Sequence, residues 1–140
     1  MSDIILKALS EYGLNEGPGS TNNTAILQMA VDCGFPDYKN DDIAWCSLFA
    51  NWVCLKTGYQ RSNSLSARSW LKVGESTSTP QLGDIVVLWR DSKDSWKGHV
   101  GFYINTVDTT VYMLAGNQNN MVSIQGFQNT RVLDYRKLNK

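Results

Sequence analysis

Residues 44–52 read AWCSLFANW, and this stretch predicts an amphipathic helix that opens with a tryptophan beside a cysteine. We expect Asp41 or Asp42 to cap the helix and Gly58 to end it, because these residue types are typical at those positions. Cys46 would then lie in the first turn, where unpaired backbone N–H groups and the helix dipole favour an anion. The position of Cys46 is therefore compatible with a buried core thiol and with a nucleophile.

A cysteine nucleophile needs a base, and His99 is the only histidine in the chain. The thiolate is the attacking species, and the unperturbed pKa of histidine suits the task of generating it. Cys54 would lie in the body of the helix, and Cys33 lies near a helix end where the dipole opposes a thiolate. Cys46 is therefore the preferred nucleophile, although a lone cysteine is often a small buried hydrophobe. The pair by itself leaves both interpretations open.

Hydrophobic periodicity divides the chain into a helical first half and a strand-rich second half. Helices are expected over 4–12, 24–33 and 67–73 in addition to the one that carries Cys46. Short β-branched and aromatic runs separated by polar turns then predict about five strands, over 83–90, 99–105, 110–116, 121–127 and 131–136. Helices followed by strands is the α+β pattern, here with N-terminal helices packed on an antiparallel sheet.

Composition limits the function classes. The 140 residues carry a formal net charge of zero, which argues against a protein held to nucleic acid or to a membrane by charge. No apolar run is long enough to span a bilayer, and the three cysteines suit reduced thiols. The first residues lack a basic start and a long apolar core, so we expect synthesis in the cytoplasm without a signal peptide. No calcium-loop pattern is present, so no metal or other cofactor is expected.

Four segments occur in an order that resembles a known family: AWCSLFANWV at 44–53, TPQLGDIVVLWR at 79–90, GHVGFYI at 98–104 and LAGNQNN at 114–120. Together they resemble the CHAP family of cysteine- and histidine-dependent amidohydrolases and peptidases, which is related to the NlpC-type peptidases of the papain-like superfamily. LNEGPGSTNN at 14–23 and ARSWLKVG at 67–74 also resemble a subgroup found in phage endolysins and bacterial toxin effectors. The resemblance implies a papain-like, NlpC-like fold and one CHAP-like domain over 1–140.

The resemblance also implies catalytic roles. Cys46 would be the nucleophile, His99 the general base, and Asn117 the polar third residue that orients the imidazole. Many relatives carry a glutamate just before that asparagine, and this chain does not, which leaves the charge partner of His99 open. Gln118 is the second candidate for the orienting residue. Asn117 would alternatively be a plain turn residue, since Gly-Asn is common in turns.

Several further residues are expected near the substrate. Glu16 is a solvated loop carboxylate by default, and the resemblance suggests a place at the rim of the site. Trp45 is the tryptophan expected to touch substrate, ahead of Trp70 and Trp96, because it adjoins the thiol. Ser47 could supply a backbone N–H beside the one that Cys46 itself offers to an oxyanion. The expected substrate-binding set is Trp45, Glu16, Ser47 and Gln118.

The function that the resemblance implies is hydrolysis of an amide bond in bacterial peptidoglycan. The bond would join muramic acid to L-alanine (an amidase) or lie in the stem or cross-bridge peptide (an endopeptidase). Such an enzyme would reach the cell wall after lysis or by dedicated export, as a phage lysin or an antibacterial effector, with an immunity protein or a secretion-system carrier as partner. The alternatives are a papain-like protease or deamidase toxin acting on a protein, and an inactive wall-binding module of the same fold.

Overall fold

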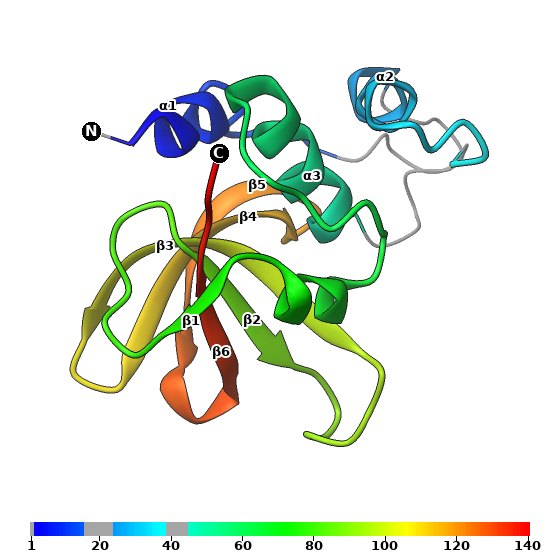
Figure 1. The fold of residues 1–140 in the computed structure, drawn as a ribbon. Coiled ribbons are helices and arrows are strands. Elements are labelled where there is room, and N and C mark those ends of the chain that lie inside the picture. Colours follow the sequence, from blue (N-terminus) through cyan, green and yellow to red (C-terminus); the bar gives the residue numbers. More distant parts are fainter. Residues whose placement is uncertain (1, 16–23, 39–44) are drawn as a thin grey trace.

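The computed structural model describes residues 2–15, 24–38 and 45–140 of the chain. Its helical part comes first and consists of α1 (Asp3–Leu9), α2 (Thr24–Cys33), α3 (Cys46–Thr57) and the 3-10 helix η1 (Ala67–Lys72). Figure 1 shows α1, α2 and α3 above the sheet, with α3 nearest to it among these three, while η1 lies lower, beside β2. No helix in the described residues is long and apolar enough to cross a membrane.

The second part is one antiparallel sheet with the strand order β1-β6-β2-β3-β4-β5. The strands are β1 (Glu75–Thr77), β2 (Ile85–Trp89), β3 (Gly98–Val107), β4 (Thr110–Gln118), β5 (Met121–Gln128) and β6 (Val132–Lys137). The predicted α+β class, with N-terminal helices on an antiparallel sheet, is therefore confirmed. The sixth strand, β1, was not predicted, because its sequence EST carries no hydrophobic alternation.

The connection between β5 and β6 shows that the sheet curls. β5 and β6 flank the three strands β4, β3 and β2 in the sheet, yet only the 3-10 turn η2 (Asn129–Arg131) joins them. So short a link cannot cross a flat sheet of that width, since strands lie about 4.8 Å apart. The sheet therefore bends into a partial barrel, and a small hydrophobic cluster fills its inner side with residues from β2, β4, β5 and β6: Val86, Leu88, Val111, Met113, Ala115, Phe127, Val132 and Tyr135.

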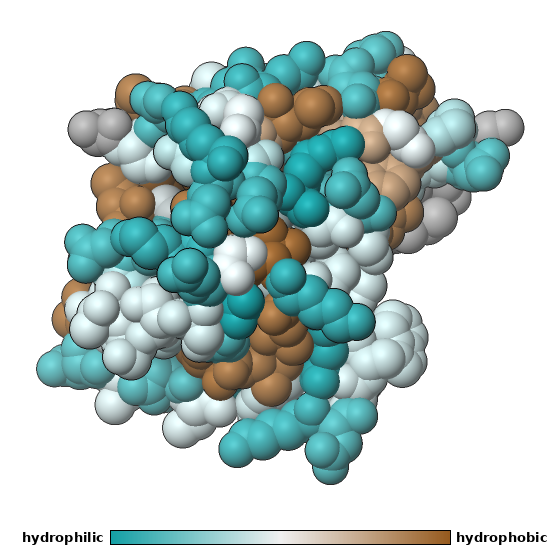
Figure 2. Space-filling model, in the orientation of Figure 1, coloured by the Kyte–Doolittle hydropathy of each residue, from teal (hydrophilic) through white to brown (hydrophobic). Residues whose placement is uncertain are grey.

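The main core lies on the other face, between the sheet and the helices. α3 is buried along nine of its residues and supplies fully buried side chains such as Leu48, Phe49 and Val53. β2, β3 and β4 contribute the facing residues Ile85, Val100, Phe102 and Leu114. Figure 2 shows that hydrophilic residues cover most of the face turned to the viewer, with hydrophobic residues in smaller patches between them. Most of the buried apolar side chains in the described residues therefore belong to this core, and a smaller group belongs to the inner cluster.

Helix ends agree with local sequence signals where the structure describes them. α2 has the predicted bounds, and Gly58 ends α3 in the left-handed conformation with φ of 81°. α1 ends at Leu9, three residues before the predicted end, and its first turn is capped by Ser2. The predicted caps Asp41 and Asp42 lie outside the described residues. The residue preceding α3, Trp45, makes no capping hydrogen bond with its side chain.

Asn51 ties α3 to the loop that follows it. Its side chain is fully buried, donates to Ser64 O at 3.1 Å and Ser62 Oγ at 3.2 Å, and accepts from Asn63 N at 2.9 Å. Sequence periodicity cannot find such a residue, because an asparagine on a buried helix face is read as an exposed position. Asn51 therefore fixes the path of residues 62–64, which lead into one wall of the site described below.

We expect Asn51→Ala to lower the free energy of unfolding by about 2–4 kcal/mol, because it removes several buried hydrogen bonds and leaves their partners unsatisfied. Urea denaturation measures this directly. Gln28→Ala is the matched control, since Gln28 makes one exposed hydrogen bond to Asp32 on α2. A change below about 0.5 kcal/mol for Asn51→Ala, similar to that expected at an exposed site, would contradict the role of this side chain.

Candidate active site

Two elements far apart in the sequence bring Cys46 and His99 together. Cys46 is the first residue of α3, and His99 is the second residue of β3, where it pairs with Leu88 of β2. The thiol and the imidazole lie close enough for each side chain to shift the pKa of the other. Both groups are almost buried, with 5% of Cys46 and 7% of His99 exposed. The structure thus places the predicted cysteine and histidine in direct contact.

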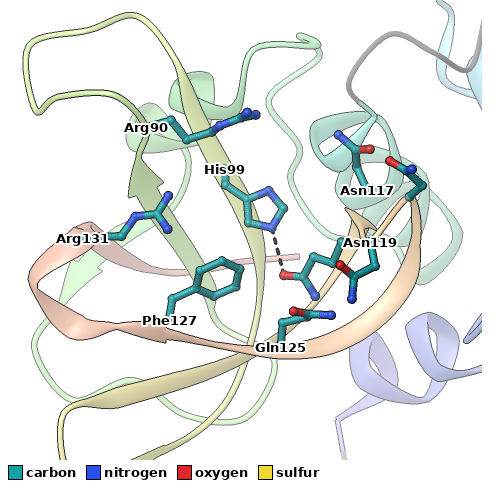
Figure 3. A pocket seen from close by; sticks show the side chains of 9 residues that line it. Arg90, His99, Asn117, Asn119, Gln125, Phe127 and Arg131 are labelled. Atoms are coloured by element: carbon teal, nitrogen blue, oxygen red, sulfur yellow. Dashed lines mark hydrogen bonds between the residues drawn. The ribbon is translucent and has the colours of Figure 1, made fainter.

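Gln118 determines which nitrogen of the ring faces the thiol. Its Oε1 lies 2.9 Å from His99 Nε2, the contact drawn as a dashed line in Figure 3. Its Nε2 donates to the carbonyl oxygens of Ser123 at 2.7 Å and Met113 at 3.4 Å, so the amide cannot turn over without losing these bonds. Gln118 Oε1 is therefore the acceptor and His99 Nε2 carries a hydrogen. This leaves Nδ1 as the nitrogen that exchanges a proton with Cys46.

The electrostatics of the pair favour a thiolate and an imidazolium. Burial opposes both charges, yet His99 and the backbone N–H groups of Val100 and Ser47 hold the pKa of Cys46 below its usual value. Burial and the charge of Arg90 likewise oppose the imidazolium, while Cys46 and the Gln118 hydrogen bond keep the pKa of His99 above its usual value. Each partner therefore stabilises the charged form of the other.

The other two cysteines lack such partners. Burial raises the pKa of Cys33, and burial raises the pKa of Cys54 to about 12. Neither thiol is in a position to ionise near neutral pH, since no imidazole lies beside it in the described structure. Cys46 is thus the only one of the three cysteines in an environment that supports a nucleophile.

The predicted orienting residue, Asn117, does not occupy that position. Strand alternation would place it on the inner face of β4 with Met113 and Ala115, toward His99. The register instead shifts between Ala115 and Gln118, and Asn117 takes a left-handed conformation with φ of 60°. This bulge moves Gln118, the second candidate, into the expected place. The prediction for Asn117 is corrected: within the described structure it makes no hydrogen bond to His99, although it lines the cavity beside the ring.

The predicted substrate contact of Trp45 is also wrong. Trp45 is fully buried, and a Cβ added at Gly116 would lie 2.7 Å from its ring carbons, so the indole packs closely against β4. Trp70 is fully buried too and donates from Nε1 to Ser47 Oγ at 2.9 Å. The tryptophan that lines the site is Trp96, with 78% of its surface exposed. Aromatic character alone does not reveal which side a ring occupies.

Ser47 acts through its backbone and not as a substrate-binding side chain. The side chain is fully buried, and its Oγ donates to Ser64 O at 2.7 Å while accepting from Trp70. The backbone N–H of Ser47 helps to lower the pKa of the Cys46 thiol. Glu16, the other residue predicted near the rim, lies outside the described residues.

Two cavities flank the Cys46–His99 pair and share Arg90. The larger, of about 370 Å³, lies beside the imidazole and is lined by Arg90, His99, Asn117, Gln118, Asn119, Asn120, Gln125, Phe127 and Arg131. The smaller, of about 200 Å³, opens at the thiol and is lined by Cys46, Leu65, Ser66, Ala67, Arg90, Trp96, Lys97 and Gly98. We call them the imidazole-side and the thiol-side cavity. A bond held between them would have Cys46 on one side and His99 on the other.

Sequence reasoning missed both arginines of the imidazole-side cavity. Figure 3 shows Arg90 and Arg131 on one side of His99, with Asn117 and Asn119 on the other. Arg90 follows β2 directly and is the last residue of the segment TPQLGDIVVLWR. Its position in that segment could have indicated that it lies near the site. Arg131 comes from η2, and only the curl of the sheet brings that turn to the site.

Comparison with known protein families matches residues 38–117, more than half of the chain, to the CHAP domain. The matched range includes Cys46 and His99 and ends one residue before Gln118. Comparison with curated proteins gives no match.

We expect alkylation to select Cys46 at about pH 6, because its pKa is lowered while those of Cys33 and Cys54 are raised. Iodoacetamide labelling followed by peptide mass spectrometry gives the rate at each cysteine against pH. In His99→Ala the rise in rate at Cys46 should move to higher pH, because burial then acts without the imidazolium. An unchanged profile in this variant would show that the two side chains are not coupled.

Gln118→Ala should lower kcat/KM by about 10- to 100-fold, because a hydrogen bond to a charged group is worth roughly 1.5–3 kcal/mol. It should also shift the alkylation profile of Cys46 to higher pH, since His99 loses the acceptor that supports its positive charge. Asn117→Ala, one residue earlier on the same bulge, is the matched comparison and should leave that profile in place. A larger profile shift in Asn117→Ala than in Gln118→Ala would contradict the assignment of the orienting residue.

Proposed function

The chain belongs to the CHAP domain family, whose members are cysteine- and histidine-dependent hydrolases, and we propose that this protein cleaves an amide bond of bacterial peptidoglycan. The observation that carries the proposal is the arrangement of Cys46 beside His99, whose ring is hydrogen-bonded to Gln118, with a cavity on either side. A nucleophile, a base held in one tautomer and room for substrate are the parts that amide hydrolysis needs.

In the first half of the reaction, the Cys46 thiolate adds to the carbonyl carbon of the scissile amide and forms a carbon–sulfur bond. The carbonyl π electrons move onto oxygen and give a tetrahedral oxyanion. The backbone N–H of Cys46, at the first residue of α3, is one donor for that charge, because the first N–H groups of a helix have no partner within it. His99 then gives its Nδ1 proton to the amide nitrogen, the carbon–nitrogen bond breaks, and the amine leaves.

In the second half, neutral His99 accepts a proton from a water molecule as that water attacks the thioester. The carbon–sulfur bond breaks, the carboxylic acid leaves, and the thiolate–imidazolium pair returns. Gln118 keeps Nδ1 toward the reaction throughout by accepting from Nε2–H. An amide partner supports the imidazolium less than a carboxylate would, but the buried ion partner Cys46 supplies the missing negative charge in the resting enzyme.

The bond is either the link of muramic acid to L-alanine or a bond within the stem or cross-bridge peptide. Such an activity suits a phage lysin or an antibacterial effector that reaches the wall after lysis or by dedicated export. An effector would require an immunity protein in the cell that makes it, and a secretion-system carrier for its delivery. A wall-binding module without activity is disfavoured, because it would need neither an imidazole held by Gln118 nor a thiol whose pKa is lowered beside that ring.

Cys46→Ala should abolish the release of fragments from purified peptidoglycan while the fold persists, since the thiol is a small side chain at the mouth of a cavity. Cys33→Ala is the control and should retain activity. Mass spectrometry of the products identifies the bond, because amidase action frees the amino group of L-alanine and endopeptidase action frees one further along the peptide.

Two outcomes would contradict the proposal. Wild-type rates in Cys46→Ala would exclude the thiol as nucleophile. Intact peptidoglycan together with Cys46-dependent cleavage or deamidation of a protein would place the enzyme in the class of protein-directed toxins.

A further inference from the structure

The imidazole-side cavity has an unusual charge for a protein with no net charge. Its lining includes two arginines beside the His99 imidazole, and the remaining polar groups are side-chain amides. No aspartate or glutamate is among its described lining residues. Cys46 offers a negative charge to His99, whereas the two arginines have no carboxylate among the lining residues, and the charge of Arg90 opposes protonation of His99. A cavity lined by two arginines and neutral amides attracts anions, and a bound anion would offset the charge of Arg90.

Arg131 is held in place by two of its nitrogens, and the third has no hydrogen bond to the described residues. Its Nη2 and Nε donate to Trp89 O at 3.1 and 3.3 Å, and its guanidinium lies 5.4 Å from the centre of the Phe127 ring. These contacts fix the plane of the guanidinium, while Nη1 makes no hydrogen bond to the described residues. Arg90 is exposed, and its side chain makes no hydrogen bond or ion pair within the described structure. Guanidinium groups with free donors are the usual partners of carboxylates in proteins.

The opposite wall adds neutral donors. Asn119 and Asn120 form the turn between β4 and β5, both left-handed, with φ of 53° and 62°. This is the backbone of a type I′ hairpin turn, which asparagine tolerates well. Figure 3 shows Asn119 across the cavity from the two arginines. An anion in the cavity would therefore meet cations on one side and amide groups on the other.

The positions of the catalytic atoms tell which part of the substrate enters this cavity. The carbonyl carbon must lie at Cys46, which lines the thiol-side cavity, and the leaving nitrogen must lie at His99, which lines the imidazole-side cavity. The acyl part of the substrate therefore extends past Trp96. The leaving amine extends past His99 toward the arginines.

We propose that Arg90 and Arg131 bind a free carboxylate of the leaving peptide, so that the enzyme selects amide bonds followed by an acidic or carboxyl-terminal group. The proposal rests on the peptidoglycan hydrolase function given above. Stem peptides carry free carboxylates, and amidation converts them to neutral carboxamides, so this site would distinguish the two forms. A carboxylate would also offset the repulsion that Arg90 exerts on the imidazolium.

The first arm of the test compares soluble muropeptides whose first carboxyl group beyond the scissile nitrogen is free with the same compounds carrying a carboxamide there. Wild-type enzyme should favour the carboxylate form by about tenfold in kcat/KM, the difference that one charge-assisted hydrogen bond gives. Arg90→Gln should bring the ratio close to one. Lys93→Gln is the matched control, because it removes one exposed positive charge from the same loop outside both cavities and should keep the ratio. Equal rates on both forms in the wild type would overturn the proposal.

The second arm does not depend on peptidoglycan. The rates at which iodoacetate and iodoacetamide alkylate Cys46 are compared in the wild type, Arg90→Gln and Lys93→Gln. Because both reagents react with the same thiolate, their ratio cancels any change in its pKa. The ratio of the iodoacetate rate to the iodoacetamide rate should fall several-fold in Arg90→Gln and stay unchanged in Lys93→Gln. If Arg90→Gln lowers this ratio while the wild type cuts no peptidoglycan, the anion site is supported and the proposed hydrolase function is wrong. If peptidoglycan is cut while neither ratio responds, the anion site is wrong.

Discussion

The hydrogen bond between His99 Nε2 and Gln118 Oε1 is the constraint on which the site depends. It holds the ring in one tautomer, so the other nitrogen meets the thiol of Cys46. Gln118 can do this only because its own amide nitrogen is bound to two strand carbonyl oxygens, which excludes the flipped orientation. The orientation of the imidazole is therefore set by the backbone of the sheet. A change in the β4–β5 register would move Gln118 and therefore His99, and so would alter the environment of Cys46.

The curl of the sheet makes the rest of the site. Because η2 links β5 to β6 across the open barrel, Arg131 lies near Arg90 at the end of β2. The start of β3 lies beside the start of α3, so a helix start, a histidine and the β4–β5 hairpin turn meet at one place. Asn51 completes the thiol side by holding the loop after α3. The result is a thiol-side cavity with an aromatic and partly apolar lining and an imidazole-side cavity that is cationic and rich in amides.

The fold class and the pairing of Cys46 with His99 were both accessible from sequence. Hydrophobic periods of 3.6 and 2 separate helices from strands, and a cysteine in a first helical turn together with a single histidine left few combinations. Asn117 was chosen because the resemblance implied it, and the register shift in β4 instead brings Gln118, the second candidate, to the imidazole. Trp45 was preferred to Trp96 because it adjoins the thiol, but adjacency in the sequence does not say whether a ring faces the core or a cavity. Arg131 could not be found, since its position depends on a turn that closes between strands distant in the sheet.

The titration of His99 is the most direct test of a thiolate–imidazolium pair, and a chain with one histidine gives an unambiguous signal. Nitrogen-15 NMR of the imidazole reports both the pKa and the protonated nitrogen. The account predicts a pKa above the usual histidine value in the wild type, a fall of that pKa in Cys46→Ala where burial acts without the thiolate, and a neutral ring that carries its proton on Nε2. A pKa that does not change in Cys46→Ala, or a neutral ring protonated on Nδ1, would contradict it.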